Sequence, residues 1–210
     1  KNELIQLTKN VVREELQRHP QNTNTLYLAG RLHQELMSTN SAEAAQAEAY
    51  YKQAIQSSPK RQQMHYALSD LYYRTGRSAE ALEIEKNVAD FDPELGQSQW
   101  VYGISLFYRK GDRDTGAKVI LLSQTVSYPY GLAPDELSAL TEAAIYAKDK
   151  GALRRMMDTY GNNQDIDFIR AYQAIYQRVT AAGMTDVAEY VVMHVPTQYR
   201  SSVQQGTTAQ

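Results

Sequence analysis

The residues best suited to acid–base or metal chemistry in this sequence are its four histidines. A metal site of the HExxH kind needs two histidines on one face of a helix, four residues apart in the sequence. The histidines here lie far from one another along the chain, and no such pattern occurs. An isolated histidine is more often structural or exposed than a ligand. We therefore predict no metal site at His19, His33, His65 or His194.

Nearby carboxylates also have structural explanations. Glu83 and Glu85 alternate on one expected helix, so they face different sides. Asp165 and Asp167 stand where a helix is expected to begin, and carboxylates favour the positive end of the helix dipole. The sequence has neither a glycine-rich phosphate loop nor a GxSxG motif. It therefore predicts no catalytic residues, no cofactor and no enzymatic activity.

Composition narrows the functional classes further. A net charge of −2 argues against a nucleic-acid partner, which normally requires a cationic excess. The chain has no cysteine, which excludes disulfides and thiolate metal sites. No apolar run approaches the ~18 residues of a membrane span. The basic residues around Arg154 and Arg155 form a short cluster that is expected to be a solvated face.

Proline spacing indicates how the elements that carry these residues are organised. The sequence has only 11 glycines and 6 prolines but 16 tyrosines, which favours packed helices joined by short turns. Pro59 and Pro93 are 34 residues apart, Pro93 and Pro129 are 36 apart, and Pro20 and Pro59 are 39 apart. A recurring period of this length is typical of a helical repeat.

The segment between Pro59 and Pro93 carries the clearest repeat pattern. Its first helix has a large apolar residue, a small residue and an aromatic one, a glycine follows in the turn, a small residue stands on the second helix, and a proline closes the unit. These residues are Leu68, Ser69, Tyr72, Gly76, Ala81 and Pro93. The pattern resembles the tetratricopeptide repeat family. Two positions depart from it, since Glu85 replaces an aromatic residue and His65 a tryptophan-like one.

The flanking segments extend the resemblance. The preceding unit is marked by Leu26, Ala29, Gly30, Ala47, Tyr51 and Ala54, and the following unit by Tyr102, Gly103, Leu106, Gly111, Ala117 and Leu121. In the following unit the two extra residues are expected in the turn KGDRDTG. The resulting division is an N-terminal amphipathic helix in 1–22, three repeats in 23–129, degenerate helix pairs in 130–196 and a flexible polar tail in 197–210.

The resemblance implies an all-α fold, a right-handed α-α superhelix of tetratricopeptide-type helical hairpins with about five helix pairs. Each hairpin buries its apolar stripe only against its neighbours, and small residues let the paired helices approach closely. In the degenerate part, we expect a helix to begin at Pro134 and Asp135, and turns at Gly151 and Gly183.

The resemblance also implies a binding surface, because the first helices of successive repeats line a concave groove in this family. The family positions that face this groove hold many aromatic side chains here. The predicted partner-binding residues are Tyr27, Arg31, Tyr66, Asp70, Tyr73, Arg74, Trp100, Phe107 and Tyr108. Aromatic anchors suit an extended peptide or a helix, and also the apolar faces of sugars. Alternatively these rings pack against the neighbouring repeat, and for Trp100 and Phe107 both possibilities stay open.

One known activity of the family is not expected. Some members clamp the terminal carboxylate of chaperone tails with lysine and asparagine side chains. The corresponding positions hold Tyr27 and Arg31 in the first repeat, Ala67 in the second and Trp100 in the third. The sequence therefore predicts a protein or peptide partner of another kind.

A second resemblance gives an alternative function. The segment YYKQAIQSSPKRQQMHYALSDLYYRTGR is similar to the C-terminal repeat region of bacterial O-antigen ligase-like and polymerase-like membrane proteins. This hypothesis implies that the chain is the extramembrane part of an enzyme of surface glycan assembly, on the extracytoplasmic side and tethered to membrane helices outside this sequence. Because the chain begins with Lys1, we expect it to be a fragment or a processed chain.

Overall fold

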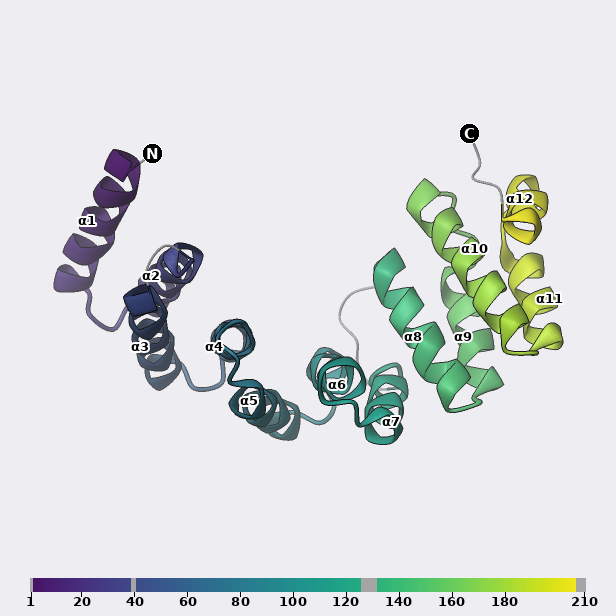
Figure 1. Cartoon of the computed structure of the whole chain (residues 1–210), viewed down its shortest axis with the longest axis horizontal. Coiled ribbons are helices and arrows are strands. Elements are labelled where there is room, and N and C mark those ends of the chain that lie inside the picture. The colour runs from purple at the N-terminus through teal and green to yellow at the C-terminus, as the bar shows by residue number, and fades with distance from the viewer. Residues whose placement is uncertain (1, 39–40, 126–131, 207–210) are drawn as a thin grey trace. The chain divides into compact units, whose positions relative to one another are not determined.

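The structure is a computed structural model that describes residues 2–38, 41–125 and 132–206. Every regular element within these ranges is helical, which confirms the predicted all-α class. The elements follow one another as α1 (Asn2–Arg18), α2 (Thr23–Leu36), α3 (Ser41–Ser57), α4 (Gln62–Arg74), α5 (Ser78–Phe91), α6 (Gly96–Ile104), the π-helix η1 (Ser105–Lys110), α7 (Arg113–Ser123), α8 (Pro134–Tyr146), α9 (Lys150–Tyr160), α10 (Ile166–Ala181), α11 (Thr185–His194), the 3-10 helix η2 (Thr197–Tyr199) and α12 (Arg200–Gln205) (Figure 1).

The chain divides into two compact units, Lys1–Asp92 and Pro93–Gln210, called unit 1 and unit 2 below. In unit 1, α2 packs with α3 and α4 with α5, while α1 lies against α2. In unit 2, α6 pairs with α7, α8 with α9 and α10 with α11, while α12 packs on α10. These hairpins agree with the predicted number of helix pairs, and α1 and α12 are additional helices.

Small residues let the helices of unit 1 approach closely. A Cβ atom at Gly30 of α2 would lie only 2.4 Å from Cε1 of Tyr51 on α3, so the tyrosine ring occupies the space that any side chain would need. Ala47 of α3 and Ala81 of α5 are fully buried. The predicted repeat residues thus lie at the contacts between helices, as ridge-and-groove packing requires.

The turn residues were predicted correctly at two places and wrongly at one. Gly76 and Gly183 have φ angles of +79° and +72°, which only glycine adopts without strain. Gly151, by contrast, is the second residue of α9 rather than a turn residue. The left-handed position in that connection is Lys148, with a φ of +56°. Asp149 then caps α9 by accepting a hydrogen bond from the backbone N–H of Ala152 at 2.9 Å, so the helix starts before the glycine.

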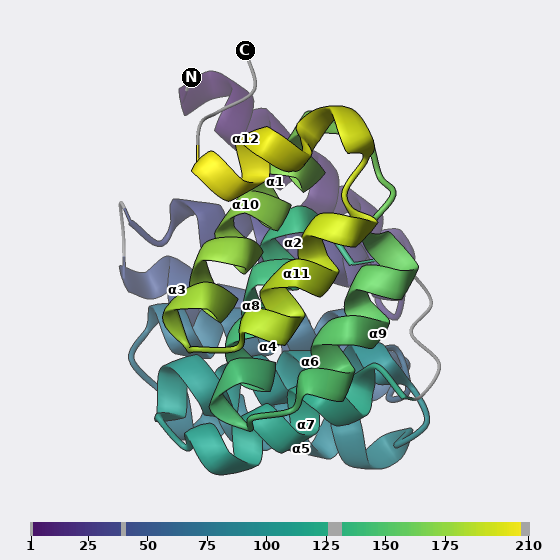
Figure 2. The ribbon, with the colours of Figure 1, turned by 90° about the vertical axis from the view of Figure 1, so that its right-hand side faces the viewer.

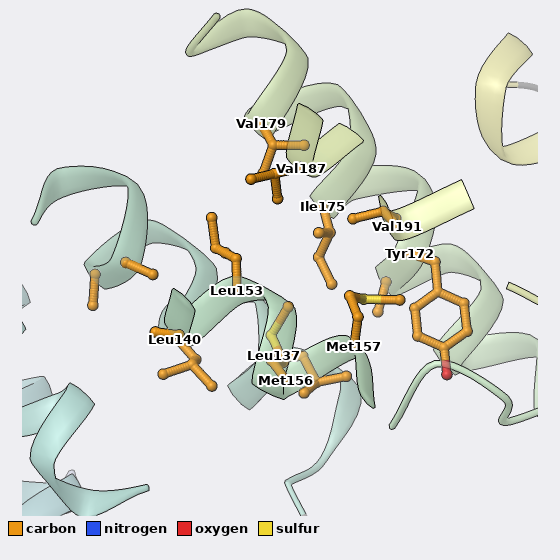
Figure 3. Close-up of a cluster of buried hydrophobic side chains, with 14 of the residues drawn as sticks. Leu137, Leu140, Leu153, Met156, Met157, Tyr172, Ile175, Val179, Val187 and Val191 are labelled. Carbon is orange, nitrogen blue, oxygen red and sulfur yellow. The ribbon is translucent and has the colours of Figure 1, made fainter. Parts of the chain in front are cut away.

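Most of the core of unit 2 comes from α8, α9, α10 and α11, the helices with the most degenerate repeat sequence. Leu137, Leu153, Ile175, Val179 and Val187 converge between these helices and are almost fully buried (Figure 3). Figure 2 shows α10 and α11 side by side, in agreement with their packing contacts. Ordinary apolar packing therefore maintains the hairpins where the family residues are missing.

The start of α8 was predicted correctly. The helix begins at Pro134, whose fixed φ suits the first position, and Asp135 stands in the first turn. Glu136 accepts a hydrogen bond from the backbone N–H of Ala133 at 2.8 Å, which satisfies one of the free donors at the helix start. The expected repeat boundary at Pro129 lies outside the described residues and stays a prediction.

The predicted flexible tail is wrong for residues 197–206. Here the chain forms η2 and α12, and Val203 of α12 is fully buried in the core of unit 2. The amide of Gln173 on α10 also donates to the carbonyl of Ser202 at 3.4 Å. A single valine in a polar segment does not predict a packed helix from the sequence alone. Whether Val203 is buried depends on the surface of α10 against which α12 packs.

The π-helix η1 was not predicted. Gly76 follows Ser69 by seven positions in the second repeat, whereas Gly111 follows Gly103 by eight positions at the equivalent places of the third. One extra residue of the third repeat therefore lies in η1, and not in the following turn where both were expected. A π-helix accommodates such an insertion by widening one turn. Gly116 of α7 permits close packing on η1, because its Cβ would lie 2.6 Å from the backbone nitrogen of Phe107.

Candidate partner-binding surface

The predicted site residues of unit 1 lie on two adjacent first helices. Tyr27 and Arg31 belong to α2, and Tyr66, Asp70, Tyr73 and Arg74 belong to α4. We call these six residues the α2–α4 surface. The two helices are joined by a hydrogen bond in which Nε2 of Gln34 donates to Oδ2 of Asp70 at 2.7 Å.

A buried polar layer supports the α2–α4 surface from below. Gln34 is only 3% exposed, and its Oε1 accepts a 2.6 Å hydrogen bond from the hydroxyl of Tyr51. Burial raises the pKa of Tyr51, so this hydroxyl stays protonated and continues to donate. Gln34 is thus held by Tyr51 on one side and Asp70 on the other, which fixes α2 against α4.

The charged side chains of the surface are paired with immediate neighbours. Arg31 donates to the hydroxyl of Tyr27 at 3.2 Å, and this hydrogen bond raises the pKa of Arg31. Nε of Arg74 lies 2.8 Å from Oδ2 of Asp70, with both side chains more than two-fifths exposed. Such exposed pairs contribute little to stability, so a partner can replace them at small cost.

The three tyrosines of the surface are half-buried. Tyr27 and Tyr73 pack partly against the hydrophobic core of unit 1, and the ring of Tyr27 lies 6.2 Å from that of Tyr51. The hydroxyl of Tyr66 lies 3.5 Å from Oε1 of Gln62 on its own helix. Packing and exposure are therefore combined in these rings, each of which shows part of its surface to solvent.

Glu85, which replaces an aromatic residue of the family pattern, has a structural role in the hairpin of α4 and α5. Its carboxylate is buried, with 5% of the residue exposed. Oε1 accepts from the hydroxyl of Ser69 at 2.7 Å, and Oε2 accepts from the hydroxyl of Tyr73 at 3.1 Å. The sequence marks Glu85 as a departure from the family, but its contact with a surface residue follows only from the structure.

The predicted site residues of unit 2 differ in exposure: two are buried and one is exposed. Trp100 and Phe107 are 6% and 2% exposed and belong to the hydrophobic core, so packing is the correct alternative for these two rings. Tyr108 is 48% exposed, and its hydroxyl donates to Oε2 of Glu142 at 2.8 Å. Counted back from the turn glycine, Tyr108 and not Phe107 corresponds to Tyr73, because the extra residue in η1 shifts the register by one.

Three of the four histidines have a carbonyl or carboxylate neighbour in the structure. Nδ1 of His33 contacts Glu43, which also accepts from Lys9 at 2.7 Å. Nε2 of His65 lies 2.8 Å from the carbonyl oxygen of Pro59, and His194 lies 3.3 Å from Asp158. Among the residues that the structure describes, no group of three histidine or acidic side chains is placed to hold a metal ion.

The basic cluster near α9 is neutralised by acidic residues. Nζ of Lys150 and Nη2 of Arg154 lie 2.7 and 3.0 Å from the carboxylate of Asp186 on α11. Both cations lower the pKa of Asp186, Lys150 by its hydrogen bond and Arg154 by its charge. The solvated face expected from the sequence is therefore a set of exposed ion pairs.

Comparison with known proteins identifies the repeat. Residues 41–99, which span α3 to the first part of α6, match the family model described as tetratricopeptide repeat. No curated protein matches the chain. In the described parts of the chain, no helix is long and apolar enough to cross a membrane.

Two solved structures are similar in fold. A crystal structure of the MamA protein is 16% identical in sequence, and the match covers 90% of this chain and 97% of that chain with a TM-score of 0.53. A second crystal structure of MamA is 17% identical, with coverage of 82% and 95% and a TM-score of 0.51. At these identities the likeness concerns the fold alone.

Proposed function

We propose that the chain is a scaffold that binds a protein or peptide on the α2–α4 surface of unit 1. Residues 41–99 match the tetratricopeptide repeat, a repeat that is typically non-catalytic, and this match supports the proposal. The observation that carries this proposal is the hydrogen bond from Gln34 to Asp70. It aligns two first helices, so that their half-buried tyrosines and exposed arginines belong to one surface.

The chemistry of this surface suits a peptide or a helix. Tyr27, Tyr66 and Tyr73 offer ring faces, and tyrosine is enriched at energetically important positions of protein interfaces. Arg31, Asp70 and Arg74 provide both signs of charge around the rings. A bound segment that carries an apolar side chain between polar ones would match this arrangement.

Selection of displayed random peptides on the full chain tests the proposal. Peptides that bind are synthesised, and their affinity is measured for the parent chain and for Tyr66→Ala. Loss of the ring is expected to weaken binding roughly 5- to 30-fold. Phe91→Ala is the control, because Phe91 is an exposed ring, 62% accessible, at the end of α5 and outside the α2–α4 surface.

Two outcomes would contradict the proposal. The first is a set of selected peptides whose affinity is the same for Tyr66→Ala, Arg31→Gln and the parent chain. The second is weaker binding to Phe91→Ala than to Tyr66→Ala. Circular dichroism of each variant establishes that the helices are retained.

The resemblance to O-antigen ligase-like proteins is an alternative that the comparisons do not support. The tetratricopeptide match includes the whole segment on which that resemblance depends, residues 50–77. The sequence that precedes Lys1 in the gene product tests it, since several apolar stretches of ~20 residues would be required there.

A further inference from the structure

Unit 2 contains a cavity of about 330 Å³ that the sequence analysis did not indicate. It is formed where α8 packs against α7 and α10. Its lining comes from the start of α7, the second half of α8 and the end of α10. These residues are Arg113, Glu142, Ile145, Tyr146, Arg178 and Ala181, and we call this place the Arg113 cavity.

The guanidinium of Arg113 is positioned by two aromatic rings. Its Cζ lies 4.5 Å from the ring centre of Phe107 and 4.9 Å from that of Tyr146. The two rings meet edge to face at 5.7 Å and an interplanar angle of 89°. Because Phe107 is buried, this pair is fixed to the core, and cation–π attraction fixes the guanidinium on it.

Among the described residues, Arg113 differs from Arg178, the other cation of this cavity, in that its guanidinium has no acidic or carbonyl partner. No residue in the described ranges accepts a hydrogen bond from its guanidinium or forms an ion pair with it. Stacking uses the faces of a guanidinium and leaves its N–H groups free at the edge. An ordered set of solvent-facing N–H donors, with no protein acceptor in the described ranges, is suited to a carboxylate, which can accept two parallel hydrogen bonds.

The other charged groups nearby already have partners. Arg178 lies 3.2 Å from Oε1 of Glu142 and donates to the carbonyl of Ser138 at 3.2 Å. Oε2 of Glu142 accepts from Tyr108. Asp114 accepts from the hydroxyl of Tyr146 at 3.0 Å, and Asp112 caps α7 through the N–H of Thr115 at 3.2 Å.

The remaining lining is apolar. Ile145 and Ala181 contribute aliphatic surface, and the ring of Tyr146, which is 41% exposed, forms a wall next to Arg113. A ligand for this cavity therefore needs a carboxylate next to an aliphatic group. Burial of the aliphatic group supplies most of the binding free energy, and the hydrogen bonds of the carboxylate fix the orientation of the ligand.

We propose that the Arg113 cavity binds an acidic side chain of a partner protein, with its carboxylate on the Arg113 guanidinium and a neighbouring aliphatic side chain against Ile145 and Tyr146. The inference rests on the proposed function, because it names the chemistry of a partner segment, but it concerns unit 2 and not the α2–α4 surface. A chain-terminal carboxylate is the less suitable source, since the residues of the family's terminal clamp are absent.

Short peptides of defined sequence test the inference on the full chain. The probe is an acetylated and amidated alanine peptide that carries one Leu–Glu pair, and the matched peptide carries Leu–Gln. Binding is followed by amide and guanidinium chemical shifts in NMR spectra. The Leu–Glu peptide is expected to shift Arg113, Ile145 and Tyr146, and to bind roughly 10-fold more tightly than the Leu–Gln peptide.

Variants assign the preference to Arg113. Arg113→Gln is expected to bind both peptides equally weakly, and Arg113→Lys to bind the Leu–Glu peptide several-fold more weakly than the parent, because lysine lacks the planar fork. Lys118→Gln, which removes the same charge from an exposed position of the same helix, is expected to behave as the parent. Retained helix content in each variant shows that the fold is intact.

The outcomes separate this inference from the proposed function. Equal affinity for Leu–Glu and Leu–Gln, or the same loss in Lys118→Gln as in Arg113→Gln, overturns it. So does tighter binding of a non-amidated peptide that ends in leucine, which would assign the cavity to a chain terminus. Shifts confined to the α2–α4 surface overturn the inference but leave the proposed function standing.

Discussion

Tyr51 and Glu85 stand at equivalent positions of two successive repeats, 34 residues apart, and each faces a different residue on the paired first helix. The ring of Tyr51 lies against Gly30, where no side chain fits. The carboxylate of Glu85 accepts a hydrogen bond from Ser69, which stands where Gly30 stands in the preceding repeat. Each hairpin of unit 1 therefore has its own matched pair at this contact.

Gly30→Ala is expected to destabilise unit 1 by about 1–3 kcal/mol, because the new methyl group overlaps the ring of Tyr51 in a closely packed contact. Denaturant unfolding followed by circular dichroism measures the change. Gly151→Ala is the control, since its Cβ would meet only the ends of the Arg155 and Asp149 side chains. A loss at Gly30 no larger than at Gly151 would show that the Tyr51 ring moves aside freely.

Glu85→Tyr places in the second repeat the side chain that the first repeat has at this position. We expect a loss of about 1–3 kcal/mol, because Ser69 occupies the space of the ring. The double variant Ser69→Gly with Glu85→Tyr is expected to regain most of this loss, while the hydroxyl of Tyr73 loses its acceptor. Unfolding free energies of the single and double variants form the test, and additive losses would refute the matching of the two positions.

Glu48 is expected to make stability depend on pH. Although burial raises the pKa of Glu48, hydrogen bonds from Lys52, Arg77 and Tyr72 lower it by more, to about 2. A carboxyl whose pKa is depressed in the folded state stabilises the fold above its unfolded pKa of ~4.3. This contribution disappears as the pH falls from about 5 towards 2.

Glu48→Gln is therefore expected to cost about 1–2 kcal/mol at pH 7 and progressively less in acid. Unfolding curves between pH 7 and pH 3 measure the difference between the variant and the parent. Glu83→Gln, on the exposed side of α5, is the control. A difference that stays constant over this range would mean that Glu48 does not titrate with a depressed pKa.

Val203→Asp is expected to destabilise unit 2 by about 2–3 kcal/mol, because it buries a carboxylate where α12 packs on α10. Gln204→Asp adds the same charge at the exposed neighbouring position and is expected to change stability by less than ~0.5 kcal/mol. Thermal unfolding distinguishes the two variants. If both have the same midpoint, residues 200–205 do not contribute a packed helix.

Periodic features of the sequence predicted most of the fold. The turn glycines Gly76 and Gly183 and the buried Ala81 follow from local conformation and helix spacing, which one segment specifies alone. The burial of Phe107 could not be predicted in the same way, because an extra residue in η1 rotates everything after it by about 100°. The Arg113 cavity combines three segments far apart in the sequence, and no spacing rule relates them.

The division of the chain at Asp92 and Pro93 has a consequence for the cooperativity of unfolding. Each unit has hydrophobic clusters of its own, and repeat proteins gain stability from neighbouring contacts. We expect a calorimetric scan to show two overlapping transitions and a van't Hoff enthalpy below the calorimetric one. Gly30→Ala should then lower only the transition midpoint of unit 1, and Val203→Asp only that of unit 2. The heat-capacity curve would therefore show which unit a substitution destabilises.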